Sequence, residues 1–178
     1  MKWFQDFKKF YNELPANLKK FLLRGAILFL AWILLYNLLL KPKGIPDAQL
    51  THIIVVSTAK TLSWFYPKVD ITHGAFIAIN NKEAIEIAPA CNGLELLVLY
   101  VGFLLCIPTG KRRFWKYAIS GIAIVTVLNI MRCAGLAAMF YHEYAMADFA
   151  HHYLFKLVIY AVIFYMWVLY SKKYLRHE

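Results

Sequence analysis

The sequence of 178 residues contains few acidic residues and few cysteines. Ten Asp and Glu stand against twenty Lys and Arg, which gives a net charge of +10. The three cysteines are Cys91, Cys106 and Cys133. An odd number of widely spaced cysteines with no C-x-x-C pair argues against a disulfide framework and against a zinc site of that kind. We therefore expect three free thiols, whose reactivity depends on their surroundings.

Polar residues are scarce in the sequence as a whole. The apolar fraction is 61%, whereas soluble domains have about 45–50%, so the composition indicates a protein that lies in lipid. The positive charge by itself would allow a nucleic acid partner. The Lys and Arg residues, however, cluster just outside the apolar runs, as membrane topology requires. The sequence thus predicts a lipid bilayer as partner, and no nucleic acid.

Four apolar runs define the predicted fold, at residues 21–40, 91–108, 117–140 and 153–170. A run of about twenty residues, at about 1.5 Å per residue, crosses a hydrocarbon core of ~30 Å. A cleaved signal peptide is the competing interpretation of the first run, but Lys41–Gly44 lacks a small-residue cleavage site. We predict an all-α polytopic membrane protein with four transmembrane helices.

The segments between these runs complete the predicted organisation. Residues 1–20 carry aromatic and basic side chains at helical spacing, which predicts an N-terminal amphipathic helix on the membrane surface. Within 41–90, the alternation on either side of Asn80-Asn81 predicts a short β-hairpin before the second transmembrane helix. Residues 21–170 then form a single membrane domain, followed by a tail at 171–178.

The distribution of positive charge predicts the orientation. Segments 1–24, 109–116 and 171–178 contain thirteen Lys and Arg, whereas 41–90 and 141–156 contain six. The positive-inside rule places the richer segments in the cytoplasm. We therefore expect both termini in the cytoplasm, with 41–90 and 141–152 on the outer face of the membrane.

Two charged residues lie inside the apolar runs. Arg132 is about fifteen residues, or ~22 Å of helix rise, from the cytoplasmic start of its run. A central arginine costs at least ~2.5–3.5 kcal/mol on insertion scales, so such residues usually face a polar interior and have a role. Glu95 lies at a similar depth in the second run, one helical turn from Cys91 and on the same predicted helical face. A carboxylate there must be paired or protonated, which predicts a structural pair between Glu95 and Arg132.

Cys91 and two histidines join Arg132 as candidates for catalysis. Cys91 opens the second run, where the positive end of a helix dipole activates a thiol. His151 and His152 lie where the outer loop meets the fourth run. The topology thus brings a thiol, an imidazole and a guanidinium from three segments to the outer face. A nucleophile, a base and a cation that stabilises a developing oxyanion are the components of acyl transfer.

These residues resemble the three motifs of the exosortase/archaeosortase family. The motifs are Ala90–Leu94 around the cysteine, Asn129-Ile130-Met131-Arg132, and His152, and the likeness covers residues 70–170. The resemblance implies that Cys91 is the nucleophile, Arg132 the oxyanion or thiolate stabiliser, and the histidine the acid/base. Because the family histidine is followed eight residues later by an aromatic residue, here Tyr160, His152 is preferred to His151.

The resemblance also carries expectations about function. It implies a cysteine protease or transpeptidase of the bacterial cytoplasmic membrane that cleaves a C-terminal sorting signal of exported proteins through a thioester, with a glycan or lipid as a possible acceptor. The short chain looks most like compact exosortases of Bacteroidetes-type bacteria. It departs from the family pattern at Asn92, where serine is usual, and at Lys156, where glycine is frequent. Asn92, Asn129 and Glu95 are supporting candidates.

Two alternatives belong to other classes. The first is a non-catalytic membrane assembly or scaffold protein, in which Glu95 and Arg132 form a packing pair and the cysteines are inert. The second is haem or metal binding by His142, His151 and His152, which lack partner spacing. We expect no cofactor and no metal.

Overall fold

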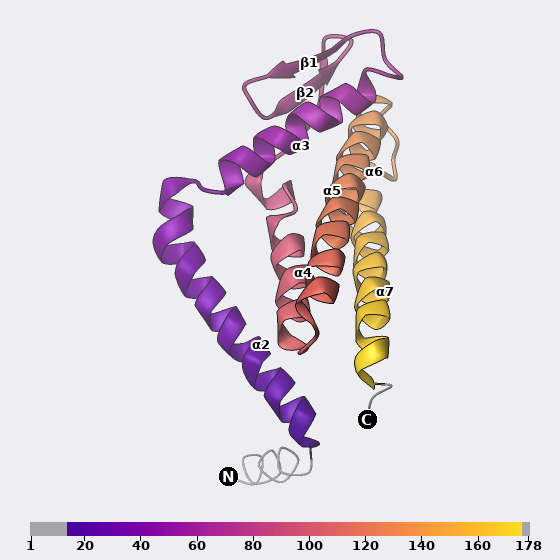
Figure 1. Cartoon of the computed structure of the whole chain (residues 1–178). Coiled ribbons are helices and arrows are strands. Elements are labelled where there is room, and N and C mark those ends of the chain that lie inside the picture. Colours follow the sequence, from indigo (N-terminus) through magenta and orange to yellow (C-terminus); the bar gives the residue numbers. More distant parts are fainter. Residues whose placement is uncertain (1–13, 176–178) are drawn as a thin grey trace, which may run out of the picture.

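The computed structural model describes residues 14–175, which form long helices with a small sheet at one end (Figure 1). Its helices follow the apolar runs, because backbone groups in lipid must satisfy their hydrogen bonds internally. In chain order the elements are helix α2 (Ala16–Leu35), a π-helical turn (Tyr36–Leu40), a 3-10 turn (Lys41–Lys43), helix α3 (Asp47–Leu62), strands β1 (Val69–Thr72), β2 (Phe76–Ile79) and β3 (Lys82–Glu86), a 3-10 turn (Pro89–Cys91), helices α4 (Leu94–Cys106), α5 (Lys111–Tyr141) and α6 (Ala147–Phe149), a second π-helical turn (Ala150–Leu154) and helix α7 (Phe155–Leu175).

Within the described residues 14–175, three helical stretches are long and apolar enough to cross a membrane, namely Ala16–Lys43, Lys111–Tyr141 and Ala147–Lys172. The chain is a mostly helical membrane protein. The remaining apolar helix, α4, has 13 residues and a length of about 20 Å, which is less than a hydrocarbon core of ~30 Å. A fourth full span stays a prediction. Of the amphipathic helix expected at 1–20, residues 1–13 lie outside the described residues.

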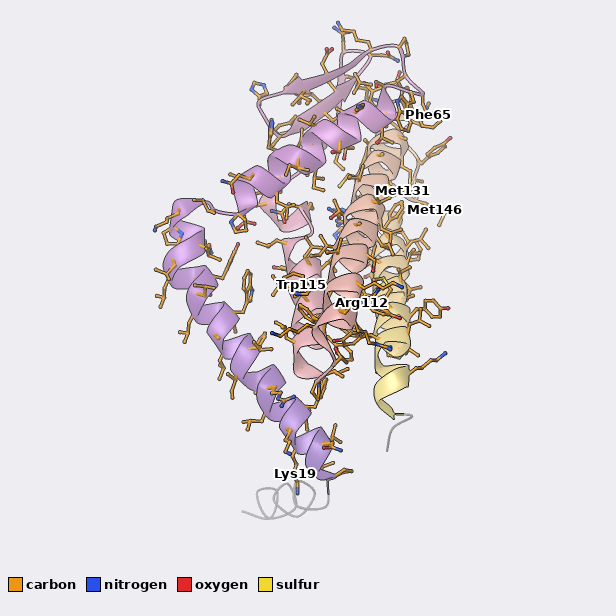
Figure 2. All side chains as sticks on the ribbon, in the orientation of Figure 1. Lys19, Phe65, Arg112, Trp115, Met131 and Met146 are labelled. Atoms are coloured by element: carbon orange, nitrogen blue, oxygen red, sulfur yellow. The ribbon has the colours of Figure 1, made fainter. Side chains whose placement is uncertain are left out.

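The long helices run between the end of the molecule that carries the sheet and the opposite end. The first residues of α2 and the last residues of α7 lie at the end opposite the sheet (Figure 1). Figure 2 shows Lys19, Arg112 and Trp115 towards that end, and Phe65 and Met146 towards the sheet. Lys19 and Arg112 therefore lie further from the sheet than Phe65 does, and the orientation of the chain in the membrane stays a prediction.

A three-stranded antiparallel sheet in the order β1-β2-β3 caps the other end. Strands β2 and β3 form the predicted hairpin, with Asn80 and Asn81 in its turn at φ angles of 50° and 69°. Asparagine tolerates this left-handed conformation, which a two-residue hairpin turn needs. Strand β1, which pairs with β2, was not predicted, because its four residues are too short to show an alternation.

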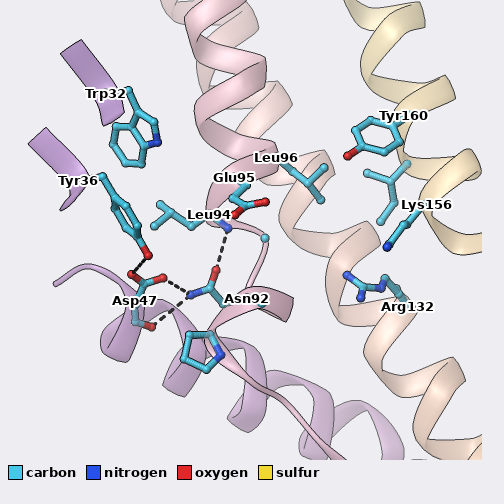
Figure 3. Close-up of a pocket in the computed structure, with 14 residues that line it drawn as sticks. Trp32, Tyr36, Asp47, Asn92, Leu94, Glu95, Leu96, Arg132, Lys156 and Tyr160 are labelled. Atoms are coloured by element: carbon cyan, nitrogen blue, oxygen red, sulfur yellow. Dashed lines mark hydrogen bonds between the residues drawn. The ribbon is translucent and has the colours of Figure 1, made fainter. Parts of the chain in front are cut away.

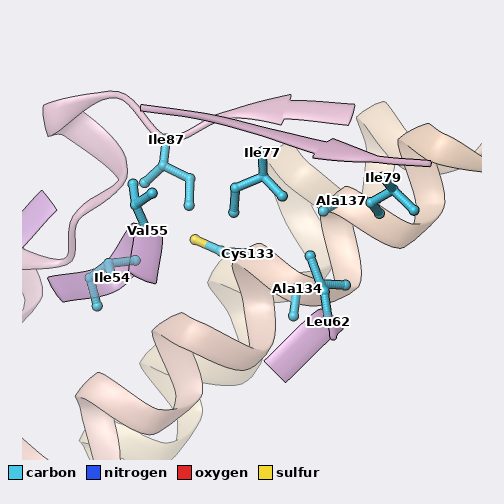
Figure 4. Packing of buried hydrophobic residues seen from close by; sticks show 9 residues of the cluster. All are labelled: Ile54, Val55, Leu62, Ile77, Ile79, Ile87, Cys133, Ala134 and Ala137. Atoms are coloured by element: carbon cyan, nitrogen blue, oxygen red, sulfur yellow. The ribbon is translucent and has the colours of Figure 1, made fainter. Parts of the chain in front are cut away.

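Two apolar clusters hold the helices and the sheet together. The first joins α3, the sheet and the upper part of α5 (Figure 4), and consists of Ile54, Val55, Leu62, Ile77, Ile79, Ile87, Cys133, Ala134 and Ala137. The second joins α4, α5 and α7 and consists of Tyr100, Leu104, Ile107, Ala118, Val125, Ile159, Ile163, Met166 and Tyr170. Helix α5 contributes to both clusters, so it fixes the sheet relative to the membrane helices.

Helix α2 stands apart from the helices around α5. It slants away from them towards the sheet (Figure 1), and none of its residues is buried. A hydrogen bond from Arg24 Nη1 to the carbonyl of Cys106 (3.3 Å) holds it near its start. Beyond its other end, Tyr36 donates its hydroxyl to Asp47 Oδ2 (2.9 Å). The position of α2 thus depends on a few contacts along its length and at its ends.

Replacing Gly121 with alanine is expected to lower the free energy of unfolding by about 1–3 kcal/mol, as overpacking does elsewhere. A methyl group at this position would overlap the ring of Tyr100. That ring is fully buried and donates its hydroxyl to the carbonyl of Tyr117 (2.9 Å). Thermal unfolding in detergent is the measurement. Gly102→Ala is the matched control, because no atom lies within 4 Å of the added methyl. Equal melting temperatures for the two variants would contradict the packing described.

Candidate active site

Cys91 ends a 3-10 turn that links strand β3 to helix α4. Its N–H donates to the carbonyl of Ala88 (2.8 Å), and the N–H of Asn92 donates to the carbonyl of Pro89 (3.2 Å). Helix α4 begins only at Leu94. The expectation that Cys91 itself opens the helix is therefore wrong: the thiol lies in a separate turn that precedes the helix by three residues.

Gly93 is the residue that separates this turn from α4. Its φ of 84° lies in the left-handed region, which glycine adopts without steric cost. A Cβ at this position would also lie only 3.1 Å from Nδ2 of Asn129 and 3.2 Å from its Cγ. Glycine is therefore needed twice, for the backbone conformation and for the close approach of α5. This approach brings the first two sequence motifs into contact.

Asn129 and Arg132 of α5 face the 3-10 turn Pro89–Cys91, which is called the cysteine turn below. Asn129 is 1% exposed and donates Nδ2 to the carbonyl of Cys91 (3.0 Å). Arg132 is 8% exposed, donates Nη1 to Asn129 Oδ1 (3.3 Å) and places Nη2 3.7 Å from the sulfur of Cys91. Residues three apart lie on one helical face, so both side chains reach the same turn. The structure thus brings together Cys91, Asn129 and Arg132.

The predicted ion pair between Glu95 and Arg132 is absent. In the described part of the chain, the ion pairs join Lys68 to Asp70 and Lys82 to Glu143. Glu95 was expected on the helical face of Cys91, but the break at Gly93 removes the two residues from one helix. The scaffold alternative therefore loses the interaction on which it was based. Glu95 instead lines a pocket beside Arg132 (Figure 3).

A polar network that the sequence did not indicate holds the cysteine turn from the other side. Asn92 is 2% exposed and accepts a hydrogen bond from the N–H of Leu94 (2.8 Å). Its Nδ2 donates to Asp47 Oδ1 (2.9 Å) and lies 3.3 Å from the hydroxyl of Thr51. Asp47 also accepts the hydroxyl of Tyr36. Tyr36 lies near the end of the first apolar run and Asp47 in the segment after it, and neither belongs to a motif, so only the fold reveals their role.

A pocket of about 370 Å³ opens between α2, α4 and α7, next to this network (Figure 3). Cys91 is half-buried and does not itself line the pocket, but its chain neighbours Ala90 and Asn92 do. Its charged and aromatic lining residues are Trp32, Tyr36, Asp47, Glu95, Arg132, Lys156 and Tyr160. A polar cavity of this kind, with a few convergent groups, is the usual form of a binding site.

The two candidate histidines lie in the π-helical turn before α7. His152 is exposed, and its Nδ1 is 3.0 Å from the carbonyl of Asp148. His151 is half-buried and lies within the electrostatic reach of Arg132 and Lys156. Within residues 14–175, no hydrogen bond links either histidine to Cys91.

The π-helical turn Ala150–Leu154 changes how the two histidines are oriented relative to α7. In a regular α-helix, His152, Lys156 and Tyr160 would share one face, since four residues make about one turn. A π-helical turn is wider, because its hydrogen bonds run from residue i to i+5. It rotates His151 towards the side on which Lys156 lines the pocket.

The other groups considered in the sequence lie elsewhere. Cys106 is buried at the far end of α4, and Cys133 is buried in the cluster below the sheet. His142 is 3.1 Å from the hydroxyl of Tyr66, through Nε2. Among the described residues, no group of three or more His, Cys, Asp and Glu side chains is arranged to hold a metal ion.

A family model for transmembrane exosortases matches residues 15–169, which is most of the chain. The chain belongs to the transmembrane exosortase family. No curated protein and no solved structure matches it. In this exosortase family member, the match extends well beyond the region of the three motifs. It includes α2 and α3, and therefore Tyr36 and Asp47 as well as Cys91 and Arg132.

Cys91 is expected to react with a membrane-impermeant thiol reagent at least tenfold faster than Cys106 or Cys133, because thiol reactivity requires access and a nearby cation. Cys91 is half-buried beside Arg132, whereas the other two are 4% and 1% exposed. Peptide mass spectrometry of the native protein gives the three rates. Equal, slow reaction of all three would show that Cys91 is an inert thiol.

Proposed function

We propose that this chain is a membrane-embedded cysteine protease or transpeptidase that cleaves a C-terminal sorting signal from exported proteins. The observation that carries the proposal is the contact between Nη2 of the buried Arg132 and the sulfur of the half-buried Cys91 at 3.7 Å, between residues 41 positions apart in sequence. Membership of the transmembrane exosortase family supports the same reaction.

The reaction follows from the chemistry of these groups. The sulfur of Cys91 attacks the scissile carbonyl carbon and forms a tetrahedral intermediate, whose oxygen carries a negative charge. The guanidinium of Arg132 stabilises that charge, or the charge on the sulfur before attack. Collapse of the intermediate expels the peptide amine, which takes the proton that the thiol of Cys91 gave to the histidine acid/base, and leaves a thioester on Cys91. An amine, a hydroxyl group or water then attacks the thioester and frees the thiol.

Asn129 prepares Arg132 for this role. A guanidinium has five N–H donors and no acceptor, so its orientation depends on the acceptors around it. Asn129 Oδ1 accepts from Nη1, while Asn129 Nδ2 binds the carbonyl of Cys91. The amide thereby ties the cation to the backbone of the residue that carries the nucleophile, which limits the motion between the two reacting partners.

The substrate is a membrane-anchored protein that ends in a short motif, an apolar helix and a basic tail. The pocket beside Cys91 is bounded by α2, α4 and α7, so a substrate helix in the bilayer can present its end to the thiol. Both termini face the cytoplasm of a bacterial cell and the pocket faces outward, which rests on the positive-inside distribution of charge. The acceptor is a glycan or a lipid for transpeptidation, and water for hydrolysis.

Cys91→Ala is expected to abolish processing of such a substrate, because its thiol is the one that Arg132 contacts, whereas Cys106 and Cys133 are buried. The experiment follows a candidate substrate in cells by gel mobility and by the mass of its C-terminus. Cys106→Ala is the control and keeps processing, since Cys106 lies at the other end of α4. Hydroxylamine is expected to release the substrate from the wild-type protein as a hydroxamate, which identifies the thioester. Normal processing by Cys91→Ala would contradict the proposed catalysis and favour the alternative of a non-catalytic membrane assembly protein.

The acid/base is a histidine of the pair, and the position of His151 near Arg132 and Lys156 supports it over His152. His151→Gln is expected to slow processing by about 10²–10⁴-fold, the usual contribution of general acid–base catalysis. His152→Gln is expected to slow it by less than about tenfold, since its ring is exposed and lies next to Asp148. The measurement is the initial rate of substrate processing. The reverse order would assign the role to His152, as regular helical spacing suggests.

A further inference from the structure

The carboxylate of Asp47 is shared between two other elements of the structure. Asp47 is the first residue of α3, where an acidic side chain often caps its own helix. The start of α3 has no side-chain capping hydrogen bond. Both oxygens of Asp47 are used elsewhere: Oδ2 accepts from Tyr36, and Oδ1 accepts from Asn92, each at 2.9 Å. Asp47 therefore links the end of α2, the start of α3 and the cysteine turn.

Asn92 transmits this link to the nucleophile. Its amide is 2% exposed and uses both of its ends, because Nδ2 binds Asp47 and Oδ1 accepts the N–H of Leu94. A buried amide left without its hydrogen-bond partners is destabilising, so Asp47 restricts Asn92 to one orientation. Asn92 follows Cys91 directly, and its orientation sets the path of the turn that carries the sulfur.

Tyr36 extends the link to α2. It lies in the π-helical turn after α2, and its ring stacks on Trp32 at a centroid distance of 5.4 Å. Both aromatic rings line the pocket beside Arg132. Helix α2 has no buried residue, so its position is weakly fixed by packing. The bond from Tyr36 to Asp47 is a direct connection between that helix and the residues that hold Cys91.

We propose that Asp47 is a positioning residue of the active site, which acts through Asn92 to hold Cys91 against Arg132. Its hydrogen bond with Tyr36 also ties the end of α2 to this site. The inference rests on the proposed function. A residue that only started α3 would affect the stability of the protein. A residue that positions Cys91 affects the rate of reaction at its sulfur, and does so only while Asn92 is present.

The experiment is a double-mutant cycle on the full-length protein. Asp47→Leu and Asn92→Ala are each expected to slow substrate processing by at least tenfold, as a misplaced nucleophile does. The double variant is expected to be no slower than the slower single variant, because residues that act through one another are not additive. Losses that multiply to a hundredfold or more would overturn the proposal.

A conservative variant and a control separate positioning from folding. Asp47→Asn is expected to stay within about threefold of the wild type, because its amide oxygen can accept from Asn92 while its N–H donates to the hydroxyl of Tyr36. Tyr36→Phe is expected to cause a smaller loss than Asp47→Leu, and none in the Asp47→Leu background. Asp70→Leu, the same substitution on the exposed strand β1, is expected to process normally. Loss of activity in proportion to melting temperature across all these variants would favour a purely structural role.

Alkylation of Cys91 with iodoacetamide tests the positioning role of Asp47 without relying on substrate processing. Asp47→Leu is expected to slow alkylation of Cys91 about tenfold relative to Cys106, because the sulfur loses its contact with the arginine cation. The double variant Asp47→Leu with Asn92→Ala is expected to be alkylated at Cys91 no more slowly than the slower single variant. If the wild-type protein processes no substrate, the proposed function fails and the alkylation rates alone decide whether Asp47 positions Cys91. Unchanged alkylation of Cys91 in Asp47→Leu would refute the positioning role.

Discussion

The buried guanidinium of Arg132 is the constraint on which the site depends. A cation among apolar helices is stable only where acceptors surround it. Asn129 supplies one acceptor from the same helix, and the sulfur of Cys91 lies within reach of another N–H. Because Asn129 also binds the carbonyl of Cys91, the groups that solvate the cation are the groups that define the nucleophile. Stability and chemistry are thus served by the same contacts.

The cysteine turn is held between α5 on one side and α3 on the other. On one side, α5 is fixed by two apolar clusters, one below the sheet and one among α4, α5 and α7. On the other side, α3 packs under the sheet and presents Asp47 to Asn92. Gly93 allows the turn to approach α5 without a side chain between them. A short segment with few contacts of its own is thereby given a defined position.

Helical periodicity correctly predicted which residues share a helical face where the helix is regular, and it failed where the helix is interrupted. Asn129 and Arg132 lie three residues apart within one regular helix, so their common face was predictable. Glu95 was assigned to the face of Cys91 because 91–95 was taken as continuous helix, and the left-handed Gly93 ends that continuity. The π-helical turn Ala150–Leu154 likewise shifts the register between the histidines and Lys156, which periodic spacing does not reveal.

The sequence by itself determined the membrane character, the helical class, and the residues that form the contact between the cysteine turn and α5. These follow from hydropathy, from the cost of a charge in lipid, and from a local motif. Only the tertiary structure decided the third strand, the absence of a Glu95–Arg132 pair, and the role of Tyr36 and Asp47 in holding Asn92. The reason is physical: a hydrogen bond between segments more than forty residues apart depends on how the helices pack, and neither residue carries a local pattern that indicates its partner.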